Sequence, residues 1–363
     1  MLFFQRLFIK LISLAIIITL FSGESNACTT FCLHHEQQMV FGKNYDWNID
    51  YGLVIVNKRG LQKSTMAEPG ETPFTWTSRF GSVTFNQYGR DLPSGGINEA
   101  GLVIELLWLE ETEYPKPDSR PSLGSTQWIQ YQLDTAANVE ELLASDKEVR
   151  VFSSAKIHFL ASDRSGRIAT IEFLDGKLVA HTGKQLTSTV LANSSYAASC
   201  DYLKQHRDFG GSKTISQSNE SLDRFVRASS LVKSYDPEVE SSIIKYAFNI
   251  LNDVSQGSRT QWSIVYDLQN MEVHYRTRNY RQIKTIRLQA LDFSCNAPAQ
   301  ILDMNSSQEG DVSANFKPYS RKANRNLIGK SFRGTSFLRN VPDTALDQLA
   351  KHPEEAVCQV AAE

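Results

Sequence analysis

The sequence lacks an excess of charge of either sign and lacks any apolar run long enough to cross a bilayer. Lysine and arginine number 38 against 40 aspartates and glutamates, which leaves a formal net charge of −2 over 363 residues. Such a balance gives no electrostatic basis for binding nucleic acid or an anionic membrane. The most apolar stretch, residues 11–21, is too short because a spanning helix needs about 20 residues. We therefore expect no nucleic-acid partner and no stable membrane insertion.

Cysteine is scarce as well. The chain has five cysteines, namely Cys28, Cys32, Cys200, Cys295 and Cys358. An odd number leaves at least one thiol outside any internal disulfide, and Cys28 is the natural candidate. If residues 28–33 form a strand, Cys28 and Cys32 lie roughly 13 Å apart at about 3.3 Å per residue, too far to bond to each other. The pairing of the other cysteines stays open.

The first 27 residues have the layout of a secretory signal peptide. Arg6 and Lys10 precede the apolar run, and Ser25 and Ala27 provide a small-x-small cleavage signal. Cleavage after Ala27 would leave Cys28 as the first residue of a periplasmic or secreted chain. Two alternatives are a lipoprotein with an acylated Cys28, and an ordinary buried cysteine behind a different cleavage site.

A cysteine in the first position carries a thiol and a free α-amine on the same carbon. It can supply both the nucleophile and the base of an amide-cleaving reaction. The ordinary pKa of an α-amine, about 7.7–8.0, suits proton transfer near neutral pH. An amine that is still part of a peptide bond has no such capacity. Removal of residues 1–27 would therefore activate the protein as well as direct its export.

The order of predicted elements indicates an α+β fold with antiparallel sheets. Residues 28–33 and 39–42 are typical of a hairpin. Further strands are expected over residues 53–57, 82–85, 102–107, 157–161, 168–173, 178–181, 187–192, 261–267 and 272–276. Helices are expected over residues 125–144, 222–233 and 237–254. We assign residues 28–295 to one domain and residues 296–363 to a polar, irregular C-terminal extension of unknown role, with one short helix over residues 342–351.

Several sequence blocks resemble the choloylglycine hydrolase family, which includes bile salt hydrolases and penicillin V acylases. The longer blocks read CTTF at 28–31, FGKNYDW at 41–47 and GINEAGL at 96–102, and the shorter ones LANS at 191–194 and DRF at 223–225. The resemblance implies an N-terminal-nucleophile hydrolase that cleaves linear amides without a cofactor. It implies an αββα sandwich with two antiparallel sheets between helical layers. Because relatives are often tetramers, it also implies a homotetramer.

The resemblance gives catalytic roles to five residues. Cys28 would attack the carbonyl carbon, and Asp46 would orient its α-amine. Asn193 would donate a hydrogen bond to the developing oxyanion, and Arg224 would favour the thiolate. Lys43 stands where most relatives carry arginine. Its charge is retained but the planar hydrogen-bonding fork is lost, so we expect thiolate stabilisation to survive with altered geometry.

Trp47 and Trp108 are the candidate substrate-binding residues. Trp108 falls where bile salt hydrolases have asparagine and Gram-positive penicillin V acylases have tyrosine, whereas the Gram-negative branch has tryptophan. In that branch the resemblance implies acyl pockets for phenoxyacetyl or fatty acyl groups, including N-acyl homoserine lactones. Two indoles offer a flat apolar wall that suits either group. The backbone N–H of Trp108 is the expected second oxyanion donor.

The sequence therefore predicts an exported cysteine amidohydrolase that cleaves the C–N bond of N-acyl substrates such as penicillin V or N-acyl homoserine lactones. One alternative is a conjugated bile salt hydrolase, and another is a non-catalytic acyl-ligand-binding protein, prompted by Lys43. A third is a metal site made by Cys28, Cys32, His34 and His35, although their spacing matches no standard zinc pattern and no second cluster completes it. We predict no metal and no cofactor.

Overall fold

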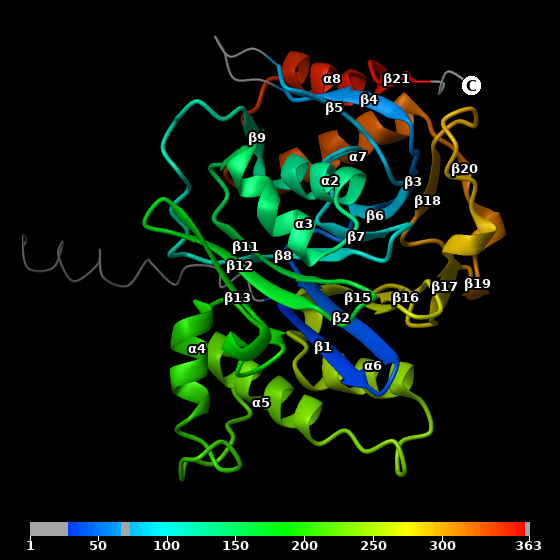
Figure 1. The fold of residues 1–363 in the computed structure, drawn as a ribbon. Helices are drawn as coiled ribbons and strands as arrows, with labels where there is room; N and C mark the ends of the chain where they lie inside the picture. The colour runs from blue at the N-terminus through cyan, green and yellow to red at the C-terminus, as the bar shows by residue number, and fades with distance from the viewer. Residues whose placement is uncertain (1–27, 67–72, 360–363) are drawn as a thin grey trace, which may run out of the picture.

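The computed structural model describes residues 28–66 and 73–359, so the predicted signal peptide lies outside the described residues. Two large sheets form the centre of the molecule (Figure 1). The first sheet has the order β14 (Val190–Leu191), β1 (Thr29–His35), β2 (Gln38–Asp46), β15 (Thr260–Asp267), β16 (Glu272–Thr277), β17 (Lys284–Arg287), β19 (Gly310–Asp311). The second has the order β13 (Lys177–Thr182), β12 (Ile168–Leu174), β11 (Ile157–Ser162), β8 (Val103–Trp108), β7 (Gly95–Asn98), β6 (Ser82–Asn86), β3 (Leu53–Asn57), β18 (Gln300–Asp303), β20 (Lys317–Pro318).

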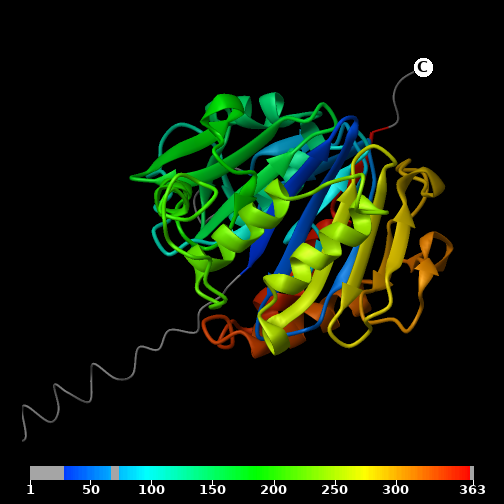
Figure 2. The ribbon, with the colours of Figure 1, turned by 90° about the horizontal axis from the view of Figure 1, so that it is seen from below.

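Helices cover the outer faces of both sheets. α5 (Ser221–Lys233) packs on β1, and α6 (Ile243–Asp253) packs on β2 and β15, as Figure 2 shows from below. α4 (Tyr196–Leu203) packs on α5. α2 (Ser125–Thr135) packs on β7 and β8, and is followed by α3 (Val139–Ala144). This arrangement confirms the predicted αββα sandwich.

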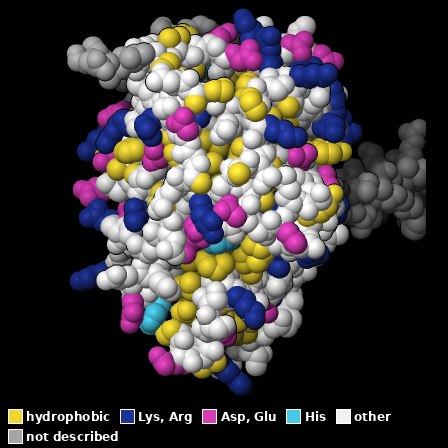
Figure 3. All heavy atoms as spheres, turned by 90° about the vertical axis from the view of Figure 1, so that its right-hand side faces the viewer, with side chains coloured by type: hydrophobic (Ala, Val, Ile, Leu, Met, Phe, Trp, Pro, Cys, Tyr) yellow, Lys and Arg dark blue, Asp and Glu magenta, His cyan; other side chains and the backbone are white. Residues whose placement is uncertain are grey.

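The apolar pattern of each covering helix explains why it packs on a sheet. α6 buries Ile243, Tyr246, Ala247, Ile250 and Leu251, which follow the i, i+3, i+4, i+7, i+8 spacing of one helical face. The main core is made by inward-facing side chains of both sheets together with α5 and α6. Within the described ranges no helix combines the length and the apolar character that a membrane span requires. Acidic and basic side chains are interspersed on the face shown in Figure 3, in keeping with the even charge balance.

The β1–β2 hairpin positions the predicted nucleophile. Its register runs from Thr29 opposite Asn44 to His35 opposite Gln38, so Cys28 lies at the level of the end of β2. β2 is longer than predicted because it continues to Asp46, where β15 pairs with it. A tight two-residue turn closes the hairpin. Hairpin register therefore brings residues 28 and 46 to the same end of one sheet.

Three further predicted elements differ from the structure. The helix expected over residues 125–144 is two helices, because the Asn138 side chain caps α3 by accepting from the backbone N–H of Glu141 at 2.9 Å. The helix expected from residue 237 begins at Ile243, after Ser242 caps it. The strand expected over residues 187–192 is confined to Val190–Leu191. In two of these cases the start of the helix is set by a polar capping residue and not by the extent of the apolar pattern.

The described part of residues 296–363 is folded, so the expectation of an irregular tail was wrong. It contributes β18 and β20 to the second sheet and β19 to the first. α8 (Asp343–Lys351) confirms the predicted short helix, whereas α7 (Arg321–Gly334) was missed because few of its residues are apolar. A small sheet of β21 (Val357–Cys358), β4 (Leu61–Ser64) and β5 (Thr75–Thr77) and a parallel pair of β9 (Ser122–Gly124) and β10 (Arg150–Phe152) complete the fold. A disulfide joins Cys295 to Cys358, while Cys28, Cys32 and Cys200 are unbonded thiols.

Candidate active site

Cys28 lies immediately before β1 and lines a cavity of about 220 Å³. Its residue is 4% exposed, and the thiol donates to the carbonyl oxygen of Asp46 at 3.9 Å. Burial raises the pKa of the Cys28 thiol, and the positive charges of Lys43 and Arg224 act in the opposite direction. The thiol therefore needs a nearby proton acceptor before it can attack a substrate.

The two carboxylate oxygens of Asp46 have different surroundings. Oδ1 accepts a hydrogen bond from the Thr260 hydroxyl, and Oδ2 is buried without a hydrogen-bond partner among the described residues. Burial raises the pKa of this carboxyl to about 6, although the positive charge of Arg224 acts against the rise. A buried, unpaired carboxylate oxygen is costly, which makes Oδ2 a strong acceptor for a cationic N–H group placed beside Cys28.

Arg224 joins the residue of the nucleophile to Asn193. It belongs to the first turn of α5 and is excluded from solvent. Nη1 donates to the Cys28 carbonyl at 2.6 Å and to the Thr29 hydroxyl at 2.5 Å, and Nη2 donates to Asn193 Oδ1 at 2.9 Å. Because a guanidinium only donates, it fixes which end of the Asn193 amide is the oxygen.

Asn193 therefore turns its amide nitrogen toward the second sheet. Nδ2 donates to the carbonyl of Trp108 at 2.8 Å, and the backbone N–H donates to the Ser221 hydroxyl at the start of α5 at 2.8 Å. A primary amide carries two hydrogens on its nitrogen. The bond to Trp108 uses one of them, and the other has no acceptor among the residues that the structure describes, so it is available to a ligand.

A buried histidine supports the chain just before Asn193. His158 Nε2 lies 2.8 Å from the carbonyl oxygen of Ala192, and Nδ1 lies 3.3 Å from Glu172 Oε1. The same Glu172 oxygen accepts from the backbone N–H of Tyr196 at 2.8 Å. The ring therefore lies between the Ala192 carbonyl and the Glu172 carboxyl group and links the two. Sequence reasoning missed this pair because its members lie on β11 and β12, far along the chain from residue 193.

Lys43 lies in the interior between the two sheets. It is excluded from solvent, its Nζ donates to the carbonyl of Leu106, and it lies 4.0 Å from Glu105 Oε2. Glu105 Oε1 accepts from the Tyr266 hydroxyl at 2.5 Å. Burial raises the pKa of Glu105 to about 7, and Lys43 opposes the rise. The buried ammonium group of Lys43 thus has an acidic partner, Glu105, in the interior.

Gly95 makes room for Glu105. The two residues are opposite each other on β7 and β8, and a Cβ built at Gly95 would lie 2.1 Å from the Glu105 carboxyl carbon. Any larger residue at this position would displace the carboxyl group from Lys43. The sequence block 96–102 overlaps β7. The position of Glu105 relative to Lys43, however, depends on how the two sheets face each other.

Trp47 and Trp108 both line the cavity beside Cys28. Their ring centroids lie 6.4 Å apart with a tilt of 37°. Trp47 Nε1 donates to the Tyr88 hydroxyl at 2.8 Å, and Trp108 Nε1 donates to Glu110 at 3.0 Å. Each indole N–H therefore has a hydrogen-bond acceptor, which leaves the ring faces available for apolar contact.

The cavity wall contains residues that the sequence did not single out. They are Tyr45, Tyr88, Leu92, Ser94, Leu106, Ser125, Thr126, Ser153, Ser154, Ala155, Ile157, Phe332, Phe337 and Leu338. Most belong to loops or strand ends from both halves of the chain, so no local motif marks them. Over residues 28–66 and 73–359, no group of three or more histidine, cysteine, aspartate or glutamate side chains is placed to hold a metal, and the metal-site alternative has no support there.

Comparisons with known proteins agree with this geometry. A family model described as linear amide C–N hydrolases, choloylglycine hydrolase family, matches residues 28–301. A penicillin V acylase of Pectobacterium atrosepticum is 29% identical over 352 residues, which cover 83% of this chain and 93% of that protein. The solved penicillin V acylase from Agrobacterium tumefaciens has a TM-score of 0.72 at 28% identity and covers 81% of this chain and 98% of its own. A mutant of the conjugated bile acid hydrolase from Clostridium perfringens has a TM-score of 0.65 at 18% identity, covers 78% of this chain and 98% of its own, and shows a shared fold.

Proposed function

Because the chain belongs to the choloylglycine hydrolase family of linear amide C–N hydrolases, we propose that it is an exported cysteine amidohydrolase of the penicillin V acylase type. One observation carries this proposal: the buried Oδ2 of Asp46 lacks a partner among the described residues, while the same residue's carbonyl accepts from the Cys28 thiol. A free α-amine on Cys28 would supply the missing donor. The proposal thus ties activity to removal of residues 1–27.

The reaction starts with proton transfer within Cys28. The α-amine takes the thiol proton as sulfur attacks the amide carbonyl carbon, and Asp46 Oδ2 accepts a hydrogen bond from the resulting ammonium. The ammonium then returns the proton to the amide nitrogen, the C–N bond breaks, and the amine leaves a thioester on sulfur. Water, deprotonated by the same α-amine, attacks the thioester. The carboxylic acid departs, and the thiol regains its proton.

In this scheme Asn193 stabilises the oxyanion and Arg224 positions Asn193. The unused hydrogen on Asn193 Nδ2 donates to the negative oxygen that forms when sulfur attacks. Arg224 keeps the amide in that orientation through its bond to Oδ1 and at the same time holds the Cys28 carbonyl. The backbone N–H of Trp108 stays a predicted second donor. Lys43 favours the thiolate by its charge.

The acyl group of the substrate would occupy the cavity between Trp47 and Trp108. The aromatic rings there, with Leu92, Leu106 and Ile157, favour an apolar group such as phenoxyacetyl or a fatty acyl chain. Penicillin V and N-acyl homoserine lactones are the substrates we propose. Location in the periplasm or outside the cell, and assembly as a homotetramer, also stay predictions.

A substrate panel with a matched pair of cysteine variants tests the function. Penicillin V, N-acyl homoserine lactones and conjugated bile salts are offered to the protein with Cys28, to Cys28→Ala and to Cys200→Ala. Cys200 is the control because it is also a buried, unbonded thiol but does not line the cavity. We expect hydrolysis of the first two substrate classes, its loss in Cys28→Ala and its retention in Cys200→Ala. Undiminished hydrolysis by Cys28→Ala would contradict the mechanism, and exclusive hydrolysis of bile salts would contradict the substrate class.

A further inference from the structure

One wall of the cavity comes from the end of the chain. Phe332, Phe337 and Leu338 line the same cavity as Cys28. They follow or end α7, drawn in orange in Figure 1, and lie beyond residue 301, where the family match stops. We call residues 332–338 the C-terminal wall. Its presence in the cavity gives the C-terminal part of the chain a place in the candidate active site.

A chain of three hydrogen bonds connects this wall to the catalytic strand. Trp47, which directly follows Asp46, donates from Nε1 to the Tyr88 hydroxyl at 2.8 Å. The Thr335 hydroxyl donates to the carbonyl of Ser331 at 2.8 Å, so its oxygen accepts the Tyr88 hydroxyl proton across 2.8 Å. Each hydroxyl donates once and accepts once. The direction of every bond in the chain is therefore fixed.

α7 is firmly attached to the loop that carries Tyr88 and Leu92. Asn324 of α7 accepts from the backbone N–H of Arg90 at 2.9 Å. Ile328 packs against Gly89, where a Cβ would lie 2.9 Å from its side chain and the backbone has φ +117°. Both α7 residues are excluded from solvent. Loop and helix therefore form one unit rather than a mobile flap.

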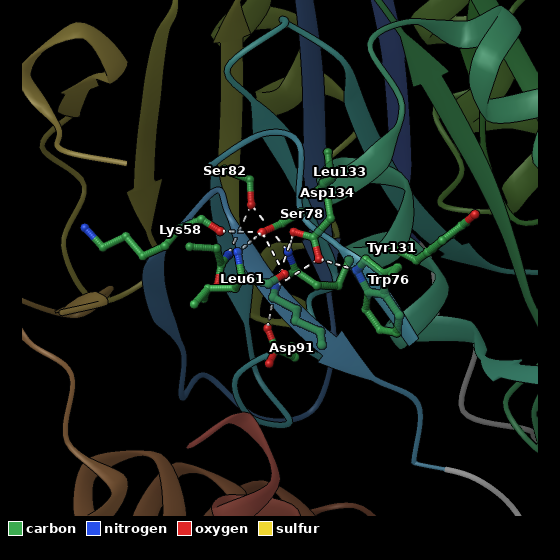
Figure 4. A network of polar contacts seen from close by, with 12 residues as sticks. Lys58, Leu61, Trp76, Ser78, Ser82, Asp91, Tyr131, Leu133 and Asp134 are labelled. Carbon is green, nitrogen blue, oxygen red and sulfur yellow. Dashed lines mark hydrogen bonds and ion pairs between the residues drawn. The ribbon is translucent and has the colours of Figure 1, made fainter. Parts of the chain in front are cut away.

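A buried ion-pair network holds the same loop from its other side. Lys63 Nζ lies 3.1 Å from Asp91 Oδ1 and 2.9 Å from Asp134 Oδ2. Figure 4 shows Asp91, Asp134 and Trp76 in this network. Asp134 also accepts from the Trp76 indole N–H at 2.8 Å. Asp91 adjoins Leu92, a cavity residue. The loop is thus fixed between this network and α7.

Phe337 is placed to meet a ligand. It is 53% exposed, and its ring centroid lies 6.4 Å from that of Trp108. Phe332 is supported differently, since its ring packs edge-on against Tyr88 at 5.8 Å between centroids. When an apolar group covers a half-exposed aromatic ring at a cavity wall, the burial of apolar surface favours binding of that group. A short acyl group held at Cys28 and Trp108 would leave Phe337 exposed.

We propose that the C-terminal wall is a specificity element that contacts the distal part of the acyl group and selects long apolar acyl chains over short ones. Phe337 is its main contact, and Leu338 completes the surface. The inference rests on the proposed function and assigns the recognition of the distal part of the acyl group to this segment. It adds to the cavity a determinant that lies outside the family match.

A chain-length series tests the proposal. Butanoyl, hexanoyl, octanoyl and decanoyl homoserine lactones are compared with the protein as it exists, with Phe337→Ala and with Ile283→Ala. Ile283 is the control because it is also an exposed apolar residue, at 39%, and does not line the cavity. We expect Phe337→Ala to lower kcat/KM for the decanoyl compound about tenfold and to leave the butanoyl compound unchanged. An equal fall at every length, or no change at any, would overturn the proposal.

Binding of the acid products separates this inference from the proposed function. The Cys28→Ala protein is titrated calorimetrically with butanoate, octanoate and decanoate, with and without Phe337→Ala. Affinity should rise with chain length, and Phe337→Ala should flatten that rise, whether or not any amide is hydrolysed. A rise that Phe337→Ala leaves intact would overturn the specificity element. Should Phe337→Ala fail to fold, Phe337→Leu takes its place, with a smaller flattening expected.

Discussion

Lys43 Nζ and Glu105 Oε2 lie 4.0 Å apart in the interior, and neither side chain reaches solvent. Lys43 comes from the first sheet and Glu105 from the second, so the pair joins the two layers. Lys43 also lowers the pKa of the Cys28 thiol, and burial raises the pKa of Glu105 to about 7. Lys43 therefore interacts electrostatically both with the nucleophile and with a buried carboxyl group of the opposite sheet.

Replacement of Lys43 tests its effect on the thiol. In Lys43→Met we expect a higher thiol pKa and a fall in kcat/KM of about tenfold, since one pKa unit corresponds to a factor of ten in thiolate. The pH dependence of alkylation by iodoacetamide measures the shift directly. Lys43→Arg is the matched control and should keep the charge. An alkylation profile in Lys43→Met that coincides with the unchanged protein would show that Lys43 has no influence on Cys28.

Asp46 should set the acid limit of activity. The pKa of its carboxyl is raised to about 6, and a neighbouring α-ammonium would lower it, so we expect kcat/KM to fall with decreasing pH at or below pH 6. For stability the sign is opposite. A carboxyl with a raised folded-state pKa stabilises the fold below its unfolded value near 3.8, and this contribution is lost as pH rises through 6.

Two variants separate the oxygens of Asp46. Asp46→Asn should lower kcat/KM about a hundredfold and remove the acid limb, because an amide can no longer stabilise the ammonium. Thr260→Val removes the hydrogen bond to Oδ1, together with the bonds that the Thr260 hydroxyl accepts from the Ser255 hydroxyl and the Gln256 backbone N–H, and should cost about tenfold. Kinetics between pH 4 and 9 measure both. The account fails here if Asp46→Asn retains full activity with an unchanged acid limb.

His158 should act on the reaction through Asn193. His158→Asn removes the contact to the Ala192 carbonyl, and we expect kcat to fall about tenfold with KM little changed, because only the oxyanion donor is displaced. Asn193→Ala should cost about a hundred- to thousandfold in kcat. Steady-state kinetics with a thermal unfolding scan give the comparison. If His158→Asn lowers stability but not kcat, its role is purely structural.

The ion-pair network around Lys63 should contribute to stability rather than to chemistry. Lys63→Met leaves two buried carboxylates without their cation and should cost about 3–5 kcal/mol in the free energy of unfolding. Lys351→Met is the control and should cost about 0–1 kcal/mol, since Lys351, the last residue of α8, pairs with Glu355 beyond the helix end and both side chains are exposed. Urea denaturation measures both values. Equal losses in the two variants would contradict the structural role of the network.

The local part of the site could be read from the sequence, and the long-range part could not. One hairpin brings Cys28 and Asp46 together, and the strand patterns located that hairpin, whereas its extension to Asp46 was not predicted and the role of Asp46 came from the family resemblance. Glu105 reaches Lys43 only because two sheets face each other, a relationship that no strand pattern encodes. Thr335 forms a hydrogen bond with Tyr88, which lies 247 positions earlier in the sequence. The residues that anchor α7 are few, and its mostly polar composition gives no pattern that identifies them.

The N-terminus of the active protein gives the most direct test of the central claim that Cys28 supplies both nucleophile and base. The intact mass of the active, exported protein is measured together with its hydrolytic rate, beside a form that begins one residue earlier at Ala27. The account predicts that the active form begins at Cys28 and that the form beginning at Ala27 is inactive, because its cysteine nitrogen belongs to a peptide bond. Full hydrolytic activity in a form that retains Ala27 would contradict it.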